Sequence, residues 1–189
     1  MNIVERVQNI IVKPTQEWDV IAKETHTVPG LFTGYVMILA AIPAVSGFIG
    51  YCIVGFGGYR VPMAYGLAHM VVSYVLSLAF VYVMALIIDA LAPQFEGERN
   101  FMQALKVAAF FPTAAWLAGI FSIIPLMSIL TILGLYSLYL LYLGLPRVMK
   151  ASEEKAMTYA VVVVIVAIVL WAVVAILSGL AMPGRMRGF

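Results

Sequence analysis

Three polar side chains recur at steps of four residues within one long apolar segment: His69, Ser73 and Ser77. Because an α-helix makes one turn in about 3.6 residues, they form a stripe along one helix face. An imidazole beside hydroxyls inside a membrane could carry protons or bind a polar solute. The simpler interpretation is a packing stripe, in which the hydroxyls bond to neighbouring helices or to their own backbone and His69 lies near the interface.

A row of tyrosines is the second candidate: Tyr136, Tyr139 and Tyr142 recur at steps of three residues. They could line a polar cavity, or their hydroxyls could bond across a helix bundle. Beside them runs a side of small residues, which allows helices to approach closely in lipid. Its members are Ser128, Thr131, Gly134 and Ser137.

Asp89 and Lys106 are ionisable residues at the ends of two successive apolar segments. A charged side chain is costly inside a bilayer, so neither residue should face lipid. One short connection separates them, which predicts an Asp89–Lys106 ion pair at the membrane surface. Its role would be structural, because pairing satisfies both charges.

Residues 1–30 contain two amphipathic stretches separated by Pro14. Apolar residues recur at helical spacing in the first stretch, and Trp18 lies on the apolar side of the second. We expect both helices to lie in the membrane interface, with Trp18 at headgroup depth. The alternative is a docking surface for a partner, to which Trp18 and two basic residues of a later loop, Arg147 and Lys150, would contribute.

The sequence contains no recognisable catalytic motif. Its two histidines, His26 and His69, lie far apart, and neither has a Cys, Asp or Glu at metal-ligand spacing. The net charge of +2 is too small to indicate nucleic-acid binding. We therefore expect no catalytic residue, no cofactor, no metal site and no nucleic-acid partner. An enzyme would require the loop acids to converge on a metal, and these are Glu96, Glu98, Glu153 and Glu154.

Composition identifies lipid as the solvent for most of the chain. Of the 189 residues, 64% are hydrophobic and 11% are charged, whereas a soluble domain has about 45–50% and about 25%. One bilayer crossing needs roughly 20 apolar residues. The uncharged run at 107–146 is about twice as long, which predicts a transmembrane hairpin that turns between Gly119 and Pro125.

The sequence therefore predicts an all-α integral membrane protein, a bundle of five transmembrane helices preceded by short amphipathic N-terminal helices. Pro43 and Pro112 should kink the first and third spans, and Pro146 should end the fourth. The expected parts are an interfacial segment at 1–30, a membrane domain at 31–182 with spans at 31–54, 66–91, 103–121, 126–145 and 157–182, and a short external tail at 183–189.

Five spans would place the two termini on opposite sides of the membrane. With the N-terminus inside, eight Lys and Arg residues lie on the inner side and three on the outer side. The positive-inside rule then places the N-terminus in the cytoplasm and the C-terminus outside. The inner set is Arg6, Lys13, Lys23, Arg99, Lys106, Arg147, Lys150 and Lys155, and the outer set is Arg60, Arg185 and Arg187.

Two long runs resemble a known family. Residues 104–125, ALKVAAFFPTAAWLAGIFSIIP, and residues 133–169, which begin LGLYSLYLLYLGLPRVMK, are similar to the bacterial branch of the Yip family, the five-span Ypt-interacting proteins. The resemblance implies a bacterial inner-membrane protein with a cytoplasmic N-terminus. In eukaryotes it implies binding of prenylated Rab-type GTPases. This chain lacks the longer N-terminal region and the Asp-Leu-Tyr-Gly-Pro motif of those members, so we do not expect that role here.

The leading hypothesis is a non-enzymatic inner-membrane protein that acts through protein or lipid contacts, as a scaffold or an organiser of the membrane. Its expected partners are membrane lipid and a membrane or cytoplasmic protein, and self-association stays open. The competing hypothesis is a small channel or transporter in which the His69 stripe and the tyrosine row face a common cavity. A water-accessible pocket lined by both would favour transport, and a dry, interdigitated bundle would favour the scaffold.

Overall fold

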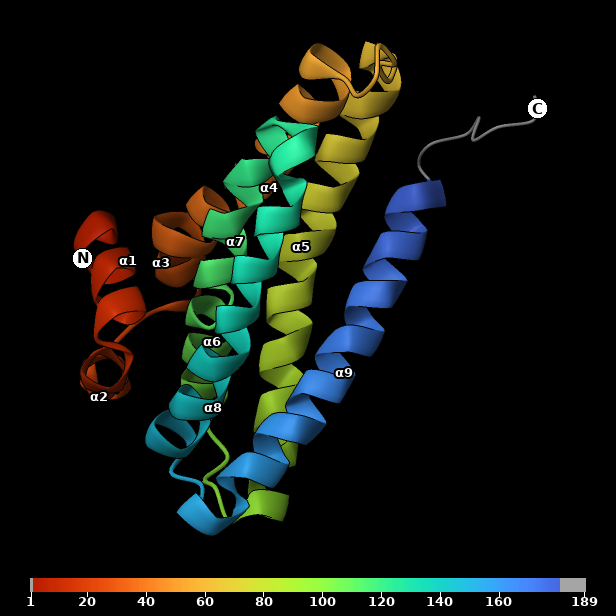
Figure 1. The fold of residues 1–189 in the computed structure, drawn as a ribbon. Coiled ribbons are helices and arrows are strands. Elements are labelled where there is room, and N and C mark those ends of the chain that lie inside the picture. Colours follow the sequence, from red (N-terminus) through yellow and green to blue (C-terminus); the bar gives the residue numbers. More distant parts are fainter. Residues whose placement is uncertain (1, 181–189) are drawn as a thin grey trace.

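The computed structural model is an all-α bundle with five segments long and apolar enough to cross a membrane (Figure 1). The structure describes residues 2–180, and no β-strand occurs among them. The expected tail at 183–189 and the last two residues of the expected fifth span lie outside the described residues. The five segments are Val28–Val54, Met63–Phe95, Phe101–Ile123, Pro125–Met149 and Glu154–Leu177.

The two ends of the bundle differ in composition. We call the end that carries residues 96–100 and 150–152 the base, and the end that carries residues 55–62 the tip (Figure 1). The base is rich in charged residues, whereas residues 49–66 and 119–126 at the tip contain a single charged residue, Arg60.

Two short helices precede the first span. Asn2 caps α1 (Ile3–Val12), because its side chain accepts hydrogen bonds from the N–H groups of Val4 and Glu5. Pro14 occupies the first turn of α2 (Pro14–Lys23), where its missing N–H costs nothing. Figure 1 shows both helices at one side of the bundle, and their apolar residues Ile10, Trp18 and Ile21 are fully buried in it.

The first span is not one straight α-helix. Pro43 lies inside its α-helical part, where it removes a backbone donor and crowds the preceding turn. The segments on either side of that part are π-helical, a form that occurs mostly as short insertions. In chain order the pieces are α3 (Val28–Leu31), η1 (Phe32–Val36), α4 (Met37–Phe48) and η2 (Ile49–Val54).

The second span is the long α5 (Met63–Leu91), which continues into the 3₁₀ turn η3 (Ala92–Phe95). It joins the first span through the tip loop. In that loop Gly55 has a φ of 75°, in the left-handed region that glycine tolerates best. The backbones of Phe56 and Tyr59 pair across the turn at 3.0 Å, which closes the loop.

The third span is the centre of the bundle, since 78% of its most apolar window is buried, against 11–33% for the other spans. Pro112 divides it as expected, because α6 (Phe101–Phe110) ends just before this proline and α7 (Thr113–Ala118) begins just after it. The span then tightens into the 3₁₀ helix η4 (Gly119–Ile123), and the chain reverses at Ile124.

The fourth span begins with an unusually long 3₁₀ helix, η5 (Pro125–Leu135), and continues as α8 (Tyr136–Met149). A 3₁₀ helix has three residues per turn, so residues spaced by three lie directly above one another. Ser128, Thr131 and Gly134 therefore form a straight row, and a Cβ on Gly134 would lie 2.9 Å from the Ala115 Cα.

Pro146 does not end the fourth span, contrary to the prediction from sequence. It lies inside α8, which runs on to Met149, and Lys150 then leaves the helix with a φ of 52°. Val148 and Met149 are buried in the core, so packing holds the last turn in place. Tertiary packing often overrides local propensity in this way.

The fifth span, α9 (Glu153–Leu180), packs most tightly through its first part. Tyr159 and Val163 are fully buried, whereas Ile165, Ile168 and most later apolar residues are largely exposed. Figure 1 shows the reason: α9 starts beside the other spans at the base and leans away from them toward the tip.

Candidate functional site: a membrane cavity and a buried ionic cluster

A cavity of about 620 Å³ lies between α9 and the other spans. His69, Ser73 and Ser77 of α5 line one side of it, as their spacing predicts, and Ser122 and Ser137 add hydroxyls from the third and fourth spans. Most of the other walls are apolar. They include Ala40, Pro43, Ala44, Gly47, Phe80, Phe111, Trp116, Leu138, Val164, Ala167, Ile168 and Trp171.

The serine protons of the stripe are already in use. The Ser73 hydroxyl donates to the Met70 carbonyl at 3.1 Å, and the Ser77 hydroxyl donates to the Tyr74 carbonyl at 2.7 Å. These are the bonds to the helix backbone that the packing interpretation anticipates. The hydroxyl oxygens remain available to the cavity as acceptors only.

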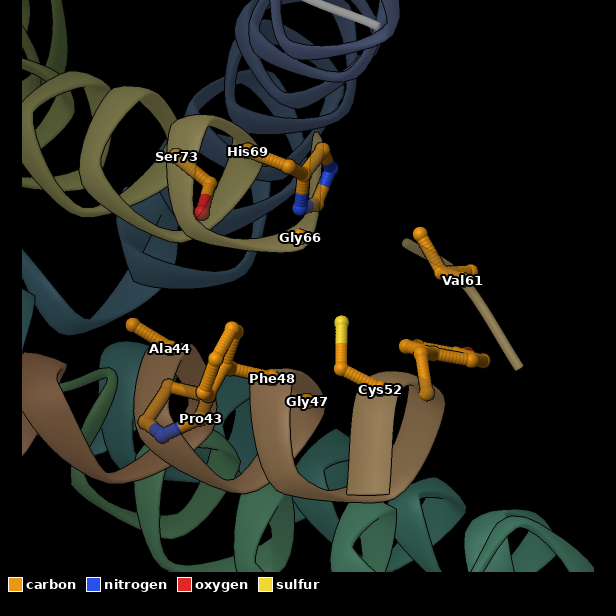
Figure 2. Close-up of a pocket in the computed structure, with 10 residues that line it drawn as sticks. Pro43, Ala44, Gly47, Phe48, Cys52, Val61, Gly66, His69 and Ser73 are labelled. Atoms are coloured by element: carbon orange, nitrogen blue, oxygen red, sulfur yellow. The ribbon is translucent and has the colours of Figure 1, made fainter. Parts of the chain in front are cut away.

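A smaller pocket of about 60 Å³ adjoins this cavity and shares His69, Ser73, Gly47 and other residues with it. Figure 2 shows the His69 ring and the Ser73 hydroxyl on the side of α5 that faces the first span, with the Cys52 thiol of η2 pointing back toward α5 near Gly66. The two helices meet closely beside it, since a Cβ on Gly66 would lie 2.0 Å from the Cys52 Sγ.

The tyrosine row does not face the cavity. The Tyr136 hydroxyl donates to the Ile11 carbonyl of α1 at 3.0 Å, and its ring contacts Tyr139 at 5.4 Å. Tyr142 packs against the hydrophobic core. The fourth span contributes Gly134, Leu135, Ser137 and Leu138 to the cavity instead. The joint cavity anticipated from the two polar rows is therefore not formed.

The densest polar cluster lies where α1 and α2 meet the bundle, and we call it the ionic cluster. Arg6 forms ion pairs with Glu17 and, at 2.5 Å, with Glu24. His26 Nε2 lies 2.9 Å from the other Glu24 oxygen. The Arg6 and Glu17 side chains are only 6% and 10% exposed, so this is a protein interior rather than a solvated helix face.

Phe110 of α6 forms the apolar floor of the ionic cluster. The Arg6 guanidinium lies 5.7 Å from the centre of its ring, within the range of a cation–π contact. The rings of Tyr35 and Trp18 pack against Phe110 at 4.5 Å and 6.4 Å. The N-terminal helices are thus anchored to the third span by charge and by aromatic packing together.

The charge of Glu24 is stabilised within the ionic cluster. Burial acts to raise the pKa of Glu24, but the hydrogen bond and charge of Arg6, followed by those of His26, outweigh it. The pKa of this carboxyl is therefore held below its ordinary value of 4.5. Glu24 remains an anion at neutral pH.

Lys106 does not pair with Asp89, which corrects the expected ion pair. Its ammonium donates to the Glu24 carbonyl at 2.6 Å, the Ala22 carbonyl at 3.3 Å and the Gln103 side chain at 2.8 Å. The last carbonyls of a helix lack internal partners and carry partial negative charge, so the C-terminus of α2 attracts this lysine. One carboxylate oxygen of Asp89 is buried without a hydrogen-bond partner among the described residues.

The three predicted partner-contact residues differ in accessibility. Trp18 is fully buried, and a Cβ on Gly144 of α8 would lie 2.8 Å from its ring, so its side chain packs within the protein and is not itself accessible to a partner. Arg147 is partly exposed and lies 3.6 Å from Asp19 on α2. Lys150 is well exposed and pairs with Glu98 at 2.8 Å.

The loops of the base are tied to one another. Besides the Lys150–Glu98 pair, Lys155 binds Glu96 at 2.6 Å, and the Glu98 N–H donates to the Met149 carbonyl at 2.9 Å. Hydrogen bonds from Lys155 and Ser152, together with the charge of Lys155, hold the pKa of Glu96 below 4.5. Among the described residues, no three His, Cys, Asp or Glu side chains converge as metal ligands would.

The sequence reasoning missed the ionic cluster. It counted Arg6 among the basic residues of the inner side and assigned no role to Glu17, Glu24, His26 or Phe110. Their separations along the chain are irregular, and the third span brings them together. The density of opposite charges in residues 5–26, just before an apolar span, was the available signal.

Comparison with known proteins supports the resemblance. The Yip1 domain matches residues 9–174 of the chain. Two relatives, both described as inner membrane protein YohC, come from Escherichia coli strain K12 and from Escherichia coli O6:H1 strain CFT073. Each is 30% identical over 128 residues, which cover 65% of this chain and 66% of the relative. No solved structure matches the chain.

Proposed function

Because this chain belongs to the Yip1 family of multi-pass membrane proteins, we propose that it is a non-enzymatic inner-membrane scaffold whose base contacts protein and lipid partners. The observation that carries the proposal is the construction of the base. Ion pairs join α2 to α8 and residues 96–98 to 150–155, so distant segments form one preassembled surface. Such a surface can bind a partner without first being ordered.

The base also carries the charges that a contact surface needs. Lys150 and Glu98 are each 66% exposed, so their pair can exchange for charges on a partner at little cost. We place the base in the cytoplasm, because most of the Lys and Arg residues lie on that side of the bundle. On this assignment a cytoplasmic protein or anionic lipid headgroups can reach α2 and both loops together.

Site-specific photo-crosslinking in native membranes tests the scaffold. The photoreactive residue replaces Gln16 or Val20, which are exposed on α2, or Tyr59, which is exposed at the tip and serves as the matched control. We expect a discrete protein adduct at the α2 positions that is absent at Tyr59 and is reproduced when the photoreactive group is placed on the captured protein. The same adduct pattern at base and tip would contradict the proposal.

Orientation has its own test. In a Cys52→Ala background, Lys150→Cys and Tyr59→Cys supply one exposed thiol at each end. We expect a membrane-impermeant maleimide to label Tyr59→Cys in intact spheroplasts and Lys150→Cys only after permeabilisation. The reverse pattern would place the base outside.

Transport is the second candidate, and the observation that favours it is the cavity beside His69. Its lining ends near Phe80 and Phe111, and the core between there and the base is closed by fully buried apolar side chains, Val81, Met84, Ile88, Leu105, Phe110 and Leu140. A solute path would have to open this core. Proteoliposomes with an internal pH dye test the idea: proton flux that His69→Ala abolishes would favour transport over the scaffold.

A further inference from the structure

We propose that the cavity between α9 and the other spans is a binding site for one membrane phospholipid, with an acyl chain in the cavity and the phosphate toward the tip. The inference goes beyond the scaffold, which concerns the base, and does not depend on it. Nothing in the scaffold requires an intramembrane ligand.

The position of the cavity selects an apolar occupant. The wall residues Ala40, Ser73, Trp116, Gly134 and Ala167 belong to five different membrane-spanning segments, so the cavity is open to lipid and not to a soluble domain. The opening arises because Val163 is the last fully buried side chain among those described in α9 and the helix then leans away, which leaves Ile165 and Ile168 exposed (Figure 1).

The size and lining of the cavity suit an apolar ligand. Its volume of about 620 Å³ lies within the roughly 300–1,000 Å³ of ligand sites. The walls are mainly apolar, and the hydroxyl protons of Ser73 and Ser77 are already in use, which disfavours a polar solute.

Charge at the tip matches a phosphate. Arg60 is the single charged residue of residues 49–66 and 119–126, and its neighbour Val61 lines the pocket that contains His69 (Figure 2). A lipid whose chain lies along the Ser73 wall would bring its phosphodiester toward this cationic end. Arginine is well suited to phosphate, because its guanidinium can donate two parallel hydrogen bonds.

Space in the cavity comes from one side of the first span. Ala40, Ala44 and Gly47 line it, and a Cβ on Gly47 would meet no atom within 4 Å. Gly47→Leu should therefore fill the cavity without a clash. Gly34 is the matched control, because a Cβ there also meets nothing within 4 Å and the residue lies outside the cavity.

Fluorescence quenching by brominated acyl chains measures occupancy. The chain has three tryptophans, of which Trp171 is exposed, Trp18 is fully buried and Trp116 is 7% exposed but lines the cavity. A Trp171→Phe protein is reconstituted into phosphatidylglycerol–phosphatidylcholine vesicles with plain or brominated acyl chains. The fluorescence that Trp116 contributes is the emission lost when Trp116→Phe is added to the Trp171→Phe protein. We expect the brominated lipid to quench this contribution.

Added to the Trp171→Phe background, Gly47→Leu should restore this emission and Gly34→Leu should leave it quenched. Ala167→Leu, on the opposite wall, should act like Gly47→Leu and guards against a variant that fails to fold. Arg60→Gln should reduce the phosphatidylglycerol retained by the purified protein in native mass spectrometry. The proposal would be overturned if the brominated lipid did not quench Trp116, or if quenching persisted unchanged in both cavity-filling variants. It would also be overturned if Trp116 were shielded from the lipid in a dimer that crosslinks through α9.

Discussion

Replacing Arg6 by methionine should detach the N-terminal helices from the bundle. The substitution keeps most of the apolar volume but removes the cation that Glu17 pairs with, and the Glu17 side chain is only 10% exposed. Breaking a buried ion pair by removing one partner costs about 3–5 kcal/mol, because the other charge stays buried without compensation. Glu17→Met should cost less, since Arg6 keeps Glu24 at 2.5 Å.

Hydrogen–deuterium exchange of residues 3–23, on protein in nanodiscs, measures this effect directly. A loss of 3–5 kcal/mol corresponds to exchange roughly 150 to 5,000 times faster, up to the point where all protection is lost. Glu5→Gln, a change of an exposed charge on the same helix, is the matched control and should stay within about 0.5 kcal/mol.

The double variant decides between pairing and simple loss of packing. Apolar residues of similar volume often replace a buried ion pair without cost, so Arg6→Met combined with Glu17→Met should recover most of the protection lost in Arg6→Met. If the double variant exchanges at least as fast as Arg6→Met alone, the two residues do not stabilise the protein as a pair, and the reasoning is refuted.

Gly144→Ala should cost about 1–3 kcal/mol of stability, since the new Cβ would lie 2.8 Å from the Trp18 ring. The loss can be measured during heating with a thiol dye that reacts when Cys52, the single cysteine, becomes exposed. An unchanged melting midpoint would contradict this prediction. When folding lowers the pKa of a carboxyl group, the charge of that group stabilises the fold. This stabilisation is complete above the pKa of the unfolded state and is lost as the pH falls through the pKa of the folded state. Docking of the N-terminal helices should therefore be insensitive to Glu24 above pH 4.5 and weaken below it, and Glu24→Gln should flatten that exchange profile. Asp89→Asn and Lys106→Met should have additive effects on stability, measured from the melting midpoint, because Lys106 binds backbone carbonyls instead of Asp89. An interaction free energy above about 1 kcal/mol in the double-mutant cycle would show that the two residues do form the ion pair predicted from the sequence.

The membrane class and the five spans could be predicted from the sequence because both depend on composition and length. A run of uncharged residues long enough to cross a bilayer twice as a helix permits few structures other than a hairpin. Pro112 divided its span as expected, because a missing N–H acts locally. Pro146 did not end its helix as expected, because the last turn is held by the burial of Met149, and that burial depends on the whole bundle.

The candidate site could be predicted only in part. The His69 stripe reaches the cavity because α5 is a regular α-helix, so spacing in the sequence maps directly onto one face. The tyrosine row does not, because other parts of the protein occupy its side of α8: the Tyr136 hydroxyl donates to the Ile11 carbonyl of α1, and Tyr142 packs against the hydrophobic core. Spacing in the sequence does not reveal which side of a helix its neighbours cover.

Charge pairing was the least predictable feature. Lys106 could be expected to need a partner, and Asp89 is the acid at the end of the preceding span, one short connection away. The structure satisfies it with backbone carbonyls of α2, which a search for opposite charges does not consider. Arg6 and Glu17 are 11 residues apart, and the turn at Pro14 together with packing on Phe110 of the third span brings them together.

The two ends of the bundle are built by different principles. At the base, charged and aromatic contacts fix α1, α2, α8 and the loops relative to the third span, and the core there is fully buried. Toward the tip, π-helical and 3₁₀ segments replace regular α-helix, α9 leans away and the cavity opens. Helical segments with strained hydrogen-bond geometry change shape more readily than α-helix. A lipid that enters from the tip side would therefore alter the packing of η2, η5 and α9 while the base keeps its shape.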